Sequence, residues 1–337
     1  MHEHLIRLAR YFNRALFCCL LICLFLFLLV VKQSSFQEKV IDNSFLYTMN
    51  YDVSGLSDYS SAEIKYGYRL FTQTNQLLGA FADSTNQIYN SALSCDNCHL
   101  NAGTQAYAMP MIGVSKVFPQ FRGRENKIGT LEERINGCFE RSMNGVVLEE
   151  RSIEMKALVA YIDWLSRFVE KDEKLIRRGL KSIEIPTRKV DLSNGEAVFQ
   201  RECTRCHGEN GQGQLLTDQI DYEYPPLWGP QSYNNGAGMT RVITAASFIK
   251  YNMPFGIDYR DPLLSDEDAY DVAGYINQQK RPYKSNREVD FPDLKKKPVS
   301  TPYGPYTDDF SIAQHQLGPF QPIMRFYEEE FGIKKTK

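Results

Sequence analysis

The pentapeptide CDNCH at residues 95–99 returns as CTRCH at residues 203–207, and these two stretches decide the fold. Two cysteines separated by two residues and followed at once by a histidine are typical of a c-type haem attachment site. A CxxC pair alone also suits a thioredoxin-like redox centre or half of a zinc site. The adjacent histidine and the second full copy favour haem at both places.

The pattern therefore predicts two covalently bound haem c groups. In each, two thiols add to the haem vinyl groups as thioethers, and the histidine beside them becomes a ligand of the iron. The predicted residues are Cys95, Cys98 and His99 for the first haem, and Cys203, Cys206 and His207 for the second.

Length and composition fit an ordinary globular protein. A chain of 337 residues with 43% hydrophobic content has room for two or three domains. The net charge of −2 gives no reason to expect nucleic acid as a partner. Of the eight cysteines, four lie in the haem motifs and three lie in an apolar N-terminal run, which leaves Cys138. Haem c is attached outside the cytoplasm, so a lone cysteine there draws attention.

The N-terminus indicates export. Arg7, Arg10 and Arg14 precede an uncharged apolar run at 15–31, which Lys32 closes. Positive charge ahead of such a run keeps the N-terminus inside and sends the rest across the membrane. No small-x-small cleavage site follows the run, so we expect an uncleaved helix that anchors a periplasmic protein to the inner membrane. The alternative is a cleaved signal and a soluble periplasmic protein.

Two modules of the same plan follow. A helix is expected to begin near Ser61, and a glycine and a phenylalanine four residues apart stand ahead of each haem motif, at Gly67 and Phe71 and at Gly195 and Phe199. An amphipathic helix with small residues follows each motif, at 157–164 and at 269–277. The prediction is an all-α fold of two tandem cytochrome c domains.

The domain boundaries follow from this plan. Residues 1–43 hold the cytoplasmic N-terminus, the membrane helix and the start of a linker, and 44–185 form the first haem domain. Residues 186–284 form the second haem domain, and 285–337 form a long extension that we expect to wrap over the haem domains. A disordered end is the alternative for the extension, and His315 within it is expected to be structural.

The distal ligand of the second haem is predicted from Met253-Pro254, which lies ahead of the last helix. A His/Met pair raises the reduction potential of a haem, which suits a station that passes electrons on. Met253 is alternatively a core residue, and Met239 is then the best substitute.

The first haem has several candidates for its distal ligand, namely Met109, Met111, Met143 and Cys138. Cys138 stands among five cations in the sequence: Arg122, Arg124, Lys127, Arg134 and Arg141. Cations lower the pKa of a thiol, and arginines bind oxyanions through two donors. An inert buried cysteine and a solvated basic surface are the plain alternatives.

At this point the chain resembles the dihaem thiosulfate dehydrogenases, which also act as tetrathionate reductases. The similar pieces are CDNCHL at 95–100 with Gly103, Phe118-Pro119, Arg124, RINGCFERSMNG at 134–145, and in the tail PYGPY at 302–306 and QHQLGPF at 314–320. The segment around Cys138 is the distinctive one, and the resemblance spans about residues 60 to 325.

The resemblance implies roles for individual residues. It makes Cys138 the distal ligand of an active-site haem, opposite His99, with Arg124, Arg134 and Ser142 holding an anionic substrate. It makes the second haem an electron relay with Met253 as ligand. Some members place a lysine directly before that methionine and exchange the two ligands. Here Asn252 takes that place and Lys250 lies two residues upstream, so we expect plain His207/Met253 ligation.

The expected reaction joins two thiosulfates into tetrathionate and passes two electrons to a cytochrome c or a membrane electron-transfer partner. The reverse reaction, the reduction of tetrathionate, is the other direction in which such an enzyme can work. A thiolate ligand lowers the reduction potential of the first haem and a methionine ligand raises that of the second. Electrons then pass downhill from the first haem to the second, which favours the oxidation of thiosulfate. A membrane-anchored dihaem electron carrier without substrate chemistry is the alternative. A dihaem peroxidase is disfavoured, because the exported part has only His99, His207 and His315.

Overall fold

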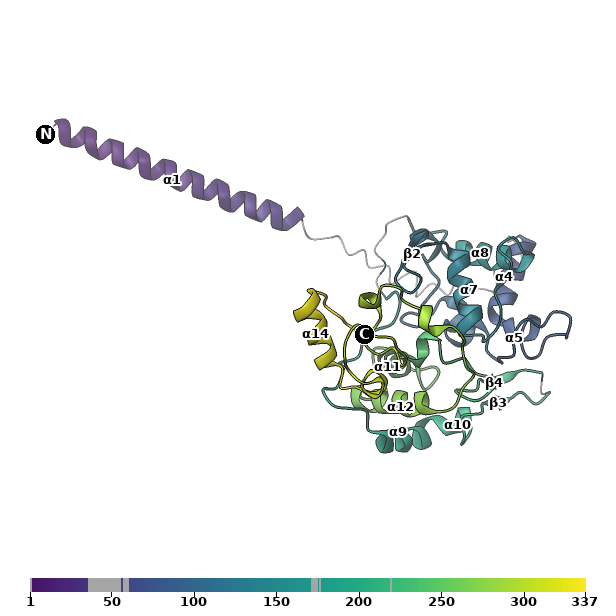
Figure 1. Ribbon diagram of the computed structural model, residues 1–337. Helices are drawn as coiled ribbons and strands as arrows, with labels where there is room; N and C mark the ends of the chain where they lie inside the picture. The colour runs from purple at the N-terminus through teal and green to yellow at the C-terminus, as the bar shows by residue number, and fades with distance from the viewer. Residues whose placement is uncertain (1, 36–55, 57–60, 171–174, 176, 219) are drawn as a thin grey trace. The chain divides into compact units, whose positions relative to one another are not determined.

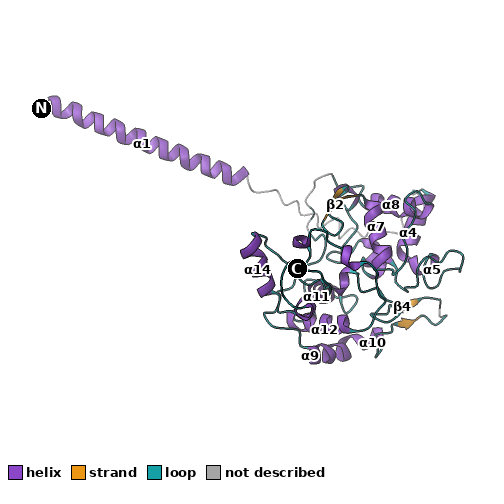
Figure 2. Ribbon diagram, in the orientation of Figure 1, coloured by secondary structure: helices purple, strands orange, loops and turns teal. Residues whose placement is uncertain are grey.

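A computed structural model of the chain describes residues 2–35, 56, 61–170, 175, 177–218 and 220–337. The chain divides into two units, Met1–Asp42 and Asn43–Lys337. The second unit contains both haem motifs and is mostly helical, with two small two-stranded sheets (Figures 1 and 2). The prediction of an all-α fold is therefore right apart from these two hairpins.

The first module begins with α4 (Ala62–Thr72), whose N-cap Ser61 accepts a hydrogen bond from the backbone N of Ile64. This is the expected start, since a serine hydroxyl satisfies a free amide of the first turn. The other elements of the module are α5 (Thr74–Leu77), η2 (Cys95–Asn97), α6 (Leu100–Gly103), η3 (Ser115–Val117), the hairpin of β1 (Gln120–Arg122) and β2 (Lys127–Gly129), α7 (Leu131–Arg141) and α8 (Ile153–Leu165).

The second module repeats the plan. Its first helix, α9 (Leu192–Val198), runs through one π-helical turn into the haem motif, and its last helix is α12 (Asp266–Gln278). The elements between and beside them are η4 (Phe199–Cys203), α10 (Thr204–His207), the hairpin of β3 (Gln214–Leu215) and β4 (Tyr222–Tyr224), η5 (Gly238–Thr240) and α11 (Val242–Asn252).

The predicted glycines lie where the first and last helices of each module cross. A Cβ atom on Gly67 would collide with the carbonyl of Ala157, and one on Gly195 would collide with the carbonyl of Asp271. Glycine at these points lets α4 reach α8 and α9 reach α12 at backbone distance. The predicted helices at 157–164 and 269–277 are the cores of α8 and α12.

Polar contacts join the two modules. Asp221 in the second module accepts hydrogen bonds from the side chains of Asn75 and Gln76 in the first. The side chain of Asn252, which is 1% exposed, donates to the carbonyl of Tyr107 at 3.2 Å and accepts from Gln105 at 2.9 Å. The two modules therefore share one interface.

The C-terminal extension is ordered and wraps as expected. It contains η6 (Arg287–Val289), η7 (Leu294–Lys296), α13 (Ile312–Leu317) and α14 (Gln321–Phe331), drawn green to yellow in Figure 1. The backbone N of Phe291 donates to the carbonyl of Arg124 in the first module. His315 is 1% exposed, contacts the carbonyl of Val299 and the carboxylate of Asp308, and stacks on Tyr306. Its predicted structural role is confirmed.

The N-terminal unit consists of the long helix α1 (His2–Ser35). Among the residues that the structure describes, no helix combines the length and the apolar character that crossing a membrane requires. The predicted anchor at 15–31 is thus not borne out, and the side chains of 26–31 lie outside those described.

Candidate functional site

The histidine of each haem motif is held with one ring nitrogen free. Nδ1 of His99 lies 2.7 Å from the carbonyl of Met109, and Nδ1 of His207 lies 2.8 Å from the carbonyl of Pro225. A carbonyl can only accept, so Nδ1 carries the proton and Nε2 presents a lone pair. This is the usual way in which a protein orients a histidine toward a metal. Burial also lowers the pKa of His207, which favours the neutral, metal-binding ring.

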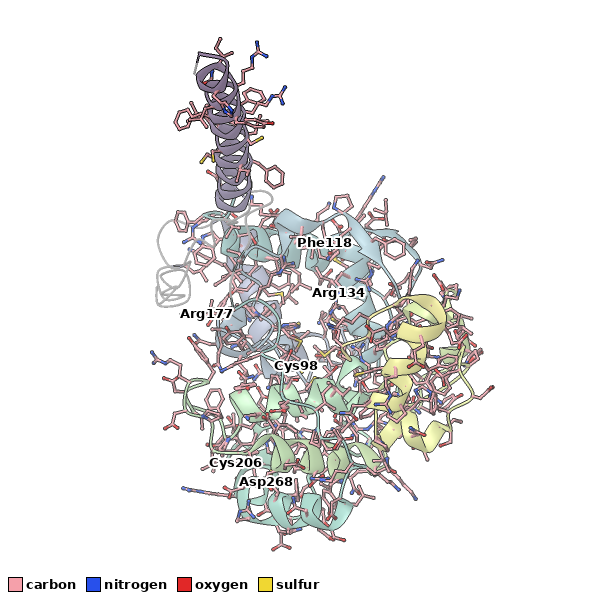
Figure 3. The ribbon with its side chains drawn as sticks, turned by 90° about the vertical axis from the view of Figure 1, so that its left-hand side faces the viewer. Cys98, Phe118, Arg134, Arg177, Cys206 and Asp268 are labelled. Atoms are coloured by element: carbon pink, nitrogen blue, oxygen red, sulfur yellow. The ribbon has the colours of Figure 1, made fainter. Side chains whose placement is uncertain are left out.

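Helix α7 positions Cys138. Its N-cap Thr130 and Glu133 form a reciprocal pair of hydrogen bonds that fixes the first turn. Arg134 and Cys138 are four residues apart and therefore share one face of the helix. Nη1 of Arg134 donates to Sγ of Cys138 at 2.7 Å. Figure 3 labels Arg134 and Cys98 in the first module and Cys206 in the second.

Cys138 is the acidic thiol of the haem region. Burial alone would raise its pKa, but the charge of Arg134, to which the contact with His99 adds, outweighs burial and lowers the pKa to about 6. Burial instead raises the pKa of Cys95, Cys98 and Cys203 to about 12. Cys138 is therefore a thiolate at neutral pH beside His99, whereas these three motif cysteines are thiols before haem attachment.

The residues present fit two haem c groups. Each module offers a pair of free cysteines and a histidine whose Nε2 is available. In the first module the Cys138 sulfur lies close enough to the His99 ring for the two to interact, so both side chains could hold one iron. Both motifs also lie within cytochrome c domains, which fits two covalent haem c groups.

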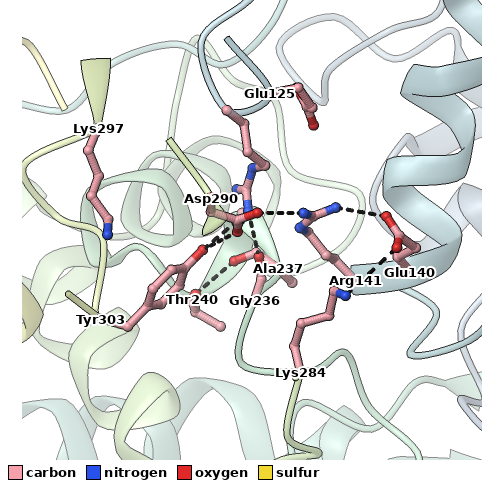
Figure 4. A network of polar contacts seen from close by, with 12 residues as sticks. Glu125, Glu140, Arg141, Gly236, Ala237, Thr240, Lys284, Asp290, Lys297 and Tyr303 are labelled. Atoms are coloured by element: carbon pink, nitrogen blue, oxygen red, sulfur yellow. Dashed lines mark hydrogen bonds and ion pairs between the residues drawn. The ribbon is translucent and has the colours of Figure 1, made fainter. Parts of the chain in front are cut away.

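Arg124 is held by the C-terminal extension rather than left free. Its Nη1 donates to a carboxylate oxygen of Asp290 at 2.7 Å, to the carbonyl of Gly236 at 3.1 Å and to the hydroxyl of Tyr303 at 3.2 Å. Asp290, which is 4% exposed, also accepts from Arg141 at 2.7 Å (Figure 4). Asp290 and Tyr303 thus fix the orientation of Arg124, and sequence reasoning missed both.

Most of the predicted basic cluster is neutralised by ion pairs. Glu125 pairs with Arg122 at 2.9 Å, and Glu133 pairs with Lys127 at 2.5 Å. Arg141 pairs with Asp290 and Glu140. In the described part of the chain, Arg134 is the one member of the cluster without a carboxylate partner. Arg122, Arg124 and Arg141 are thus paired and largely buried, whereas Lys127 lies on the solvated surface.

Ser142 lies at the end of α7. Its backbone N donates to the carbonyl of Cys138 at 2.8 Å, so it stands one turn from the sulfur. The structure therefore brings Arg134, Cys138 and Ser142 together on one helix end and places Arg124 beside Gly236 of the second module.

The methionine candidates separate into two groups. Met143 is 3% exposed and belongs to the core of the first module, against which Met111 also packs. Met109, Met239 and Met253 instead pack on a small cluster of Leu100, Ala108 and Phe248. Met253 follows the end of α11, and Lys250 on that helix donates to Asp266 at 2.7 Å.

Comparison with known proteins supports the same reading. Residues 85–170 match the cytochrome c domain of SoxA/TsdA, and residues 192–280 match the cytochrome c family. The chain is 38% identical to the thiosulfate dehydrogenase of Psychrobacter arcticus over 70% of this chain and 68% of that protein. It is 43% identical to that of Allochromatium vinosum over 57% of this chain and 71% of that protein.

A solved structure gives the same assignment. The thiosulfate dehydrogenase (TsdBA) of Marichromatium purpuratum superposes with a TM-score of 0.60 at 36% identity, over 66% of this chain and 47% of that chain. This chain therefore spans about half the length of that protein. By sequence, by domain content and by fold, the chain belongs to the thiosulfate dehydrogenase family of c-type cytochromes.

Proposed function

We propose that the chain is a dihaem oxidoreductase that joins two thiosulfates into tetrathionate and passes the two electrons to a cytochrome. The observation that carries the proposal is the hydrogen bond between Arg134 and Cys138. It makes a thiolate and places a guanidinium, the group that binds oxyanions, directly beside it.

Charge repulsion is the first obstacle to the reaction. Two thiosulfate dianions repel each other, and the repulsion grows as their outer sulfurs approach bonding distance. Arg134 has no carboxylate partner among the described residues, and its hydrogen bond to Cys138 uses only Nη1, so its other donors would be available to the substrate. Arg124, oriented by Asp290 and Tyr303, would hold a sulfonate oxygen from the other side.

We infer that the Cys138 thiolate is the covalent carrier. A bond forms between its sulfur and the outer sulfur of one thiosulfate, with loss of two electrons. The outer sulfur of a second thiosulfate then attacks the outer sulfur of the adduct, tetrathionate is released, and the Cys138 thiolate leaves. The two haem groups, when bound, supply the electron-accepting chemistry. The hydroxyl of Ser142, one turn from the sulfur, would hold a sulfonate oxygen.

We infer haem ligands from the same geometry. His99 and Cys138 would hold the iron of the first haem, and Cys95 and Cys98 its thioethers, in a domain spanning 44–185. His207 and Met253 would hold the iron of the second haem, with thioethers from Cys203 and Cys206, in a domain spanning 186–284. The ion pair between Lys250 and Asp266 supports methionine over lysine, because Lys250 is already engaged. Met239, on the same small cluster, is the substitute.

A thiolate ligand lowers the potential of one haem and a methionine raises that of the other, so electrons released at Cys138 would pass downhill to the second module. That order favours oxidation, and the reverse reaction is the reduction of tetrathionate. The acceptor would be a soluble or membrane-bound cytochrome.

We place this chemistry in the periplasm and keep the N-terminal anchor as a proposal. The apolar run at 15–31 and the three arginines before it support it. Fractionation of cells that produce the chain with and without residues 1–43, each directed to the periplasm, tests it. Recovery of the full chain in the soluble periplasmic fraction would exclude the anchor.

The decisive experiment is thiosulfate-dependent reduction of ferricyanide by the purified holoprotein. The parent is compared with Cys138→Gly and with the control Cys23→Ser, which changes an exposed cysteine of α1. We expect activity in the parent and the control and none in Cys138→Gly with both haems retained. If the parent neither oxidises thiosulfate nor reduces tetrathionate, the protein is an electron carrier.

A further inference from the structure

Arg241 belongs to the second module but faces the cations of the first. It is the N-cap residue of α11, and both its backbone N and its Nε donate to the carbonyl of Gly238 at 3.2 Å. Two residues earlier on the same loop, the carbonyl of Gly236 accepts from Nη1 of Arg124. One short loop therefore holds two guanidinium groups, Arg241 from its own module and Arg124 from the other.

The charge of Arg241 is not compensated. The described part of the chain offers it no carboxylate within ion-pair distance, and the hydrogen bond of its side chain within that part runs from Nε to the carbonyl of Gly238. Asp290, the acid that binds Arg124, is already used by Arg124 and Arg141. Burial, followed by the charges of Arg124 and Arg134, lowers the pKa of Arg241 to about 10, so it stays a cation at neutral pH.

More positive charge gathers at the same place. Burial and then the charge of Arg241 lower the pKa of Lys337, at the end of the C-terminal extension. A partly buried arginine that meets other cations, and no carboxylate within ion-pair distance among the described residues, is costly in the free protein, because like charges repel at short range. An anionic ligand would remove that cost, and such unpaired buried cations are where anions bind.

We propose that Arg241 is a substrate-binding residue that holds the sulfonate of the second thiosulfate, the one that attacks the Cys138 adduct. This rests on the function proposed above. Arg134 donates a hydrogen bond to the Cys138 sulfur and would therefore bind the first thiosulfate. The charge of Arg124 is largely offset by its ion pair with Asp290. Arg241 supplies the further charge that a second dianion requires. The active site is then completed only when the two modules are packed together.

The test separates binding from turnover. The fully oxidised holoprotein is titrated with sulfate, a dianion that cannot be oxidised by it, in an isothermal calorimeter at constant ionic strength. The same proteins are then assayed with thiosulfate and ferricyanide. The variants are Arg241→Gln, which removes the charge, Arg241→Lys, which keeps it, and the control Arg260→Gln, whose side chain is 76% exposed and pairs with Asp258.

We expect Arg241→Gln to weaken sulfate binding and to raise the KM for thiosulfate by about tenfold or more, the loss of one hydrogen bond to a charged group. Arg241→Lys should recover part of both, and Arg260→Gln should change neither. The absorption spectra of both haems should stay as in the parent.

Two results overturn the proposal. The first is that the parent oxidises thiosulfate but Arg241→Gln has the same sulfate affinity and the same KM for thiosulfate. That result removes the anion site at Arg241 and leaves the proposed function intact. The other is a parent that binds no sulfate at Arg241. A parent that binds sulfate in an Arg241-dependent way but oxidises no thiosulfate keeps the anion site and removes the proposed function.

Discussion

Nη1 of Arg134 lies 2.7 Å from Sγ of Cys138, one helical turn ahead of it on α7. The contact works in both directions. The arginine helps to lower the pKa of the thiol to about 6, and the charge of Cys138 is the largest cause of the raised pKa of Arg134. A nucleophilic sulfur and an oxyanion-binding group are therefore produced by one pair of side chains four residues apart.

The first prediction is that Arg134→Gln lowers kcat/KM for thiosulfate by about tenfold to a hundredfold, because a charge-assisted hydrogen bond is lost. Arg122→Gln is the matched control, since Glu125 already neutralises that arginine at 2.9 Å. Steady-state kinetics with ferricyanide measure both. Equal losses of kcat/KM in the two variants would mean that activity depends on the overall positive charge of this region and not on the contact between Arg134 and Cys138.

The second prediction concerns Asp290, whose carboxylate accepts hydrogen bonds from Arg124, Arg141 and Tyr303. Asp290→Asn leaves two arginines close together without their counter-charge, and we expect the free energy of unfolding to fall by about 3 kcal/mol. Asp293→Asn changes an exposed acid on the same extension and should cost less than about 1 kcal/mol. Denaturant unfolding of the holoproteins provides the measurement, and similar losses of stability in both variants would contradict this role of Asp290.

The third prediction is the pH dependence that Asp290 gives. Burial raises its pKa, but Arg124 and Arg141 outweigh burial, and the net pKa is below the ordinary value of about 4. The folded state thus binds fewer protons than the unfolded state. The stabilisation is complete above about pH 4 and is lost as the pH falls through the lower folded pKa. Below pH 4 the stability difference between the parent and Asp290→Asn should shrink, and a constant difference would refute this account.

The sequence predicts local features of this fold well. The glycine of α4 and that of α9, the capping Ser61 and the two haem motifs all depend on short-range spacing, and the structure has them as expected. The acid that orients Arg124 is different. Asp290 is separated from Arg124 by 166 residues, and nothing in the run around it marks a partner in the first module. Arg241 was missed for the same reason, because its charge matters only where the two modules meet.

The fourth prediction tests helix crossing. Gly67→Ala and Gly195→Ala each force a Cβ against the backbone of the opposite helix, and we expect each to cost about 3 kcal/mol or to prevent haem incorporation. Gly123→Ala is the control, because its Cβ would meet the nearest atom at an ordinary 3.5 Å. Yield of holoprotein and thermal unfolding are the measurements. If Gly67→Ala and Gly195→Ala both kept the stability of the parent, the paired helices would be able to move apart without a loss in the free energy of unfolding.

The last prediction decides between two methionines for the second haem. Met253 and Met239 pack on the same small cluster, and Met253, like Cys203, also packs against the core of the second module. A methionine ligand raises the potential of a haem, and its loss lowers that potential. We expect Met253→Gly to lower the potential of one haem and to leave the other unchanged in a spectroelectrochemical titration, whereas Met239→Leu changes neither. The reverse pattern would assign the ligand to Met239. A rise in the potential of that haem in Lys250→Gln would point instead to the lysine as ligand, which the ion pair with Asp266 argues against.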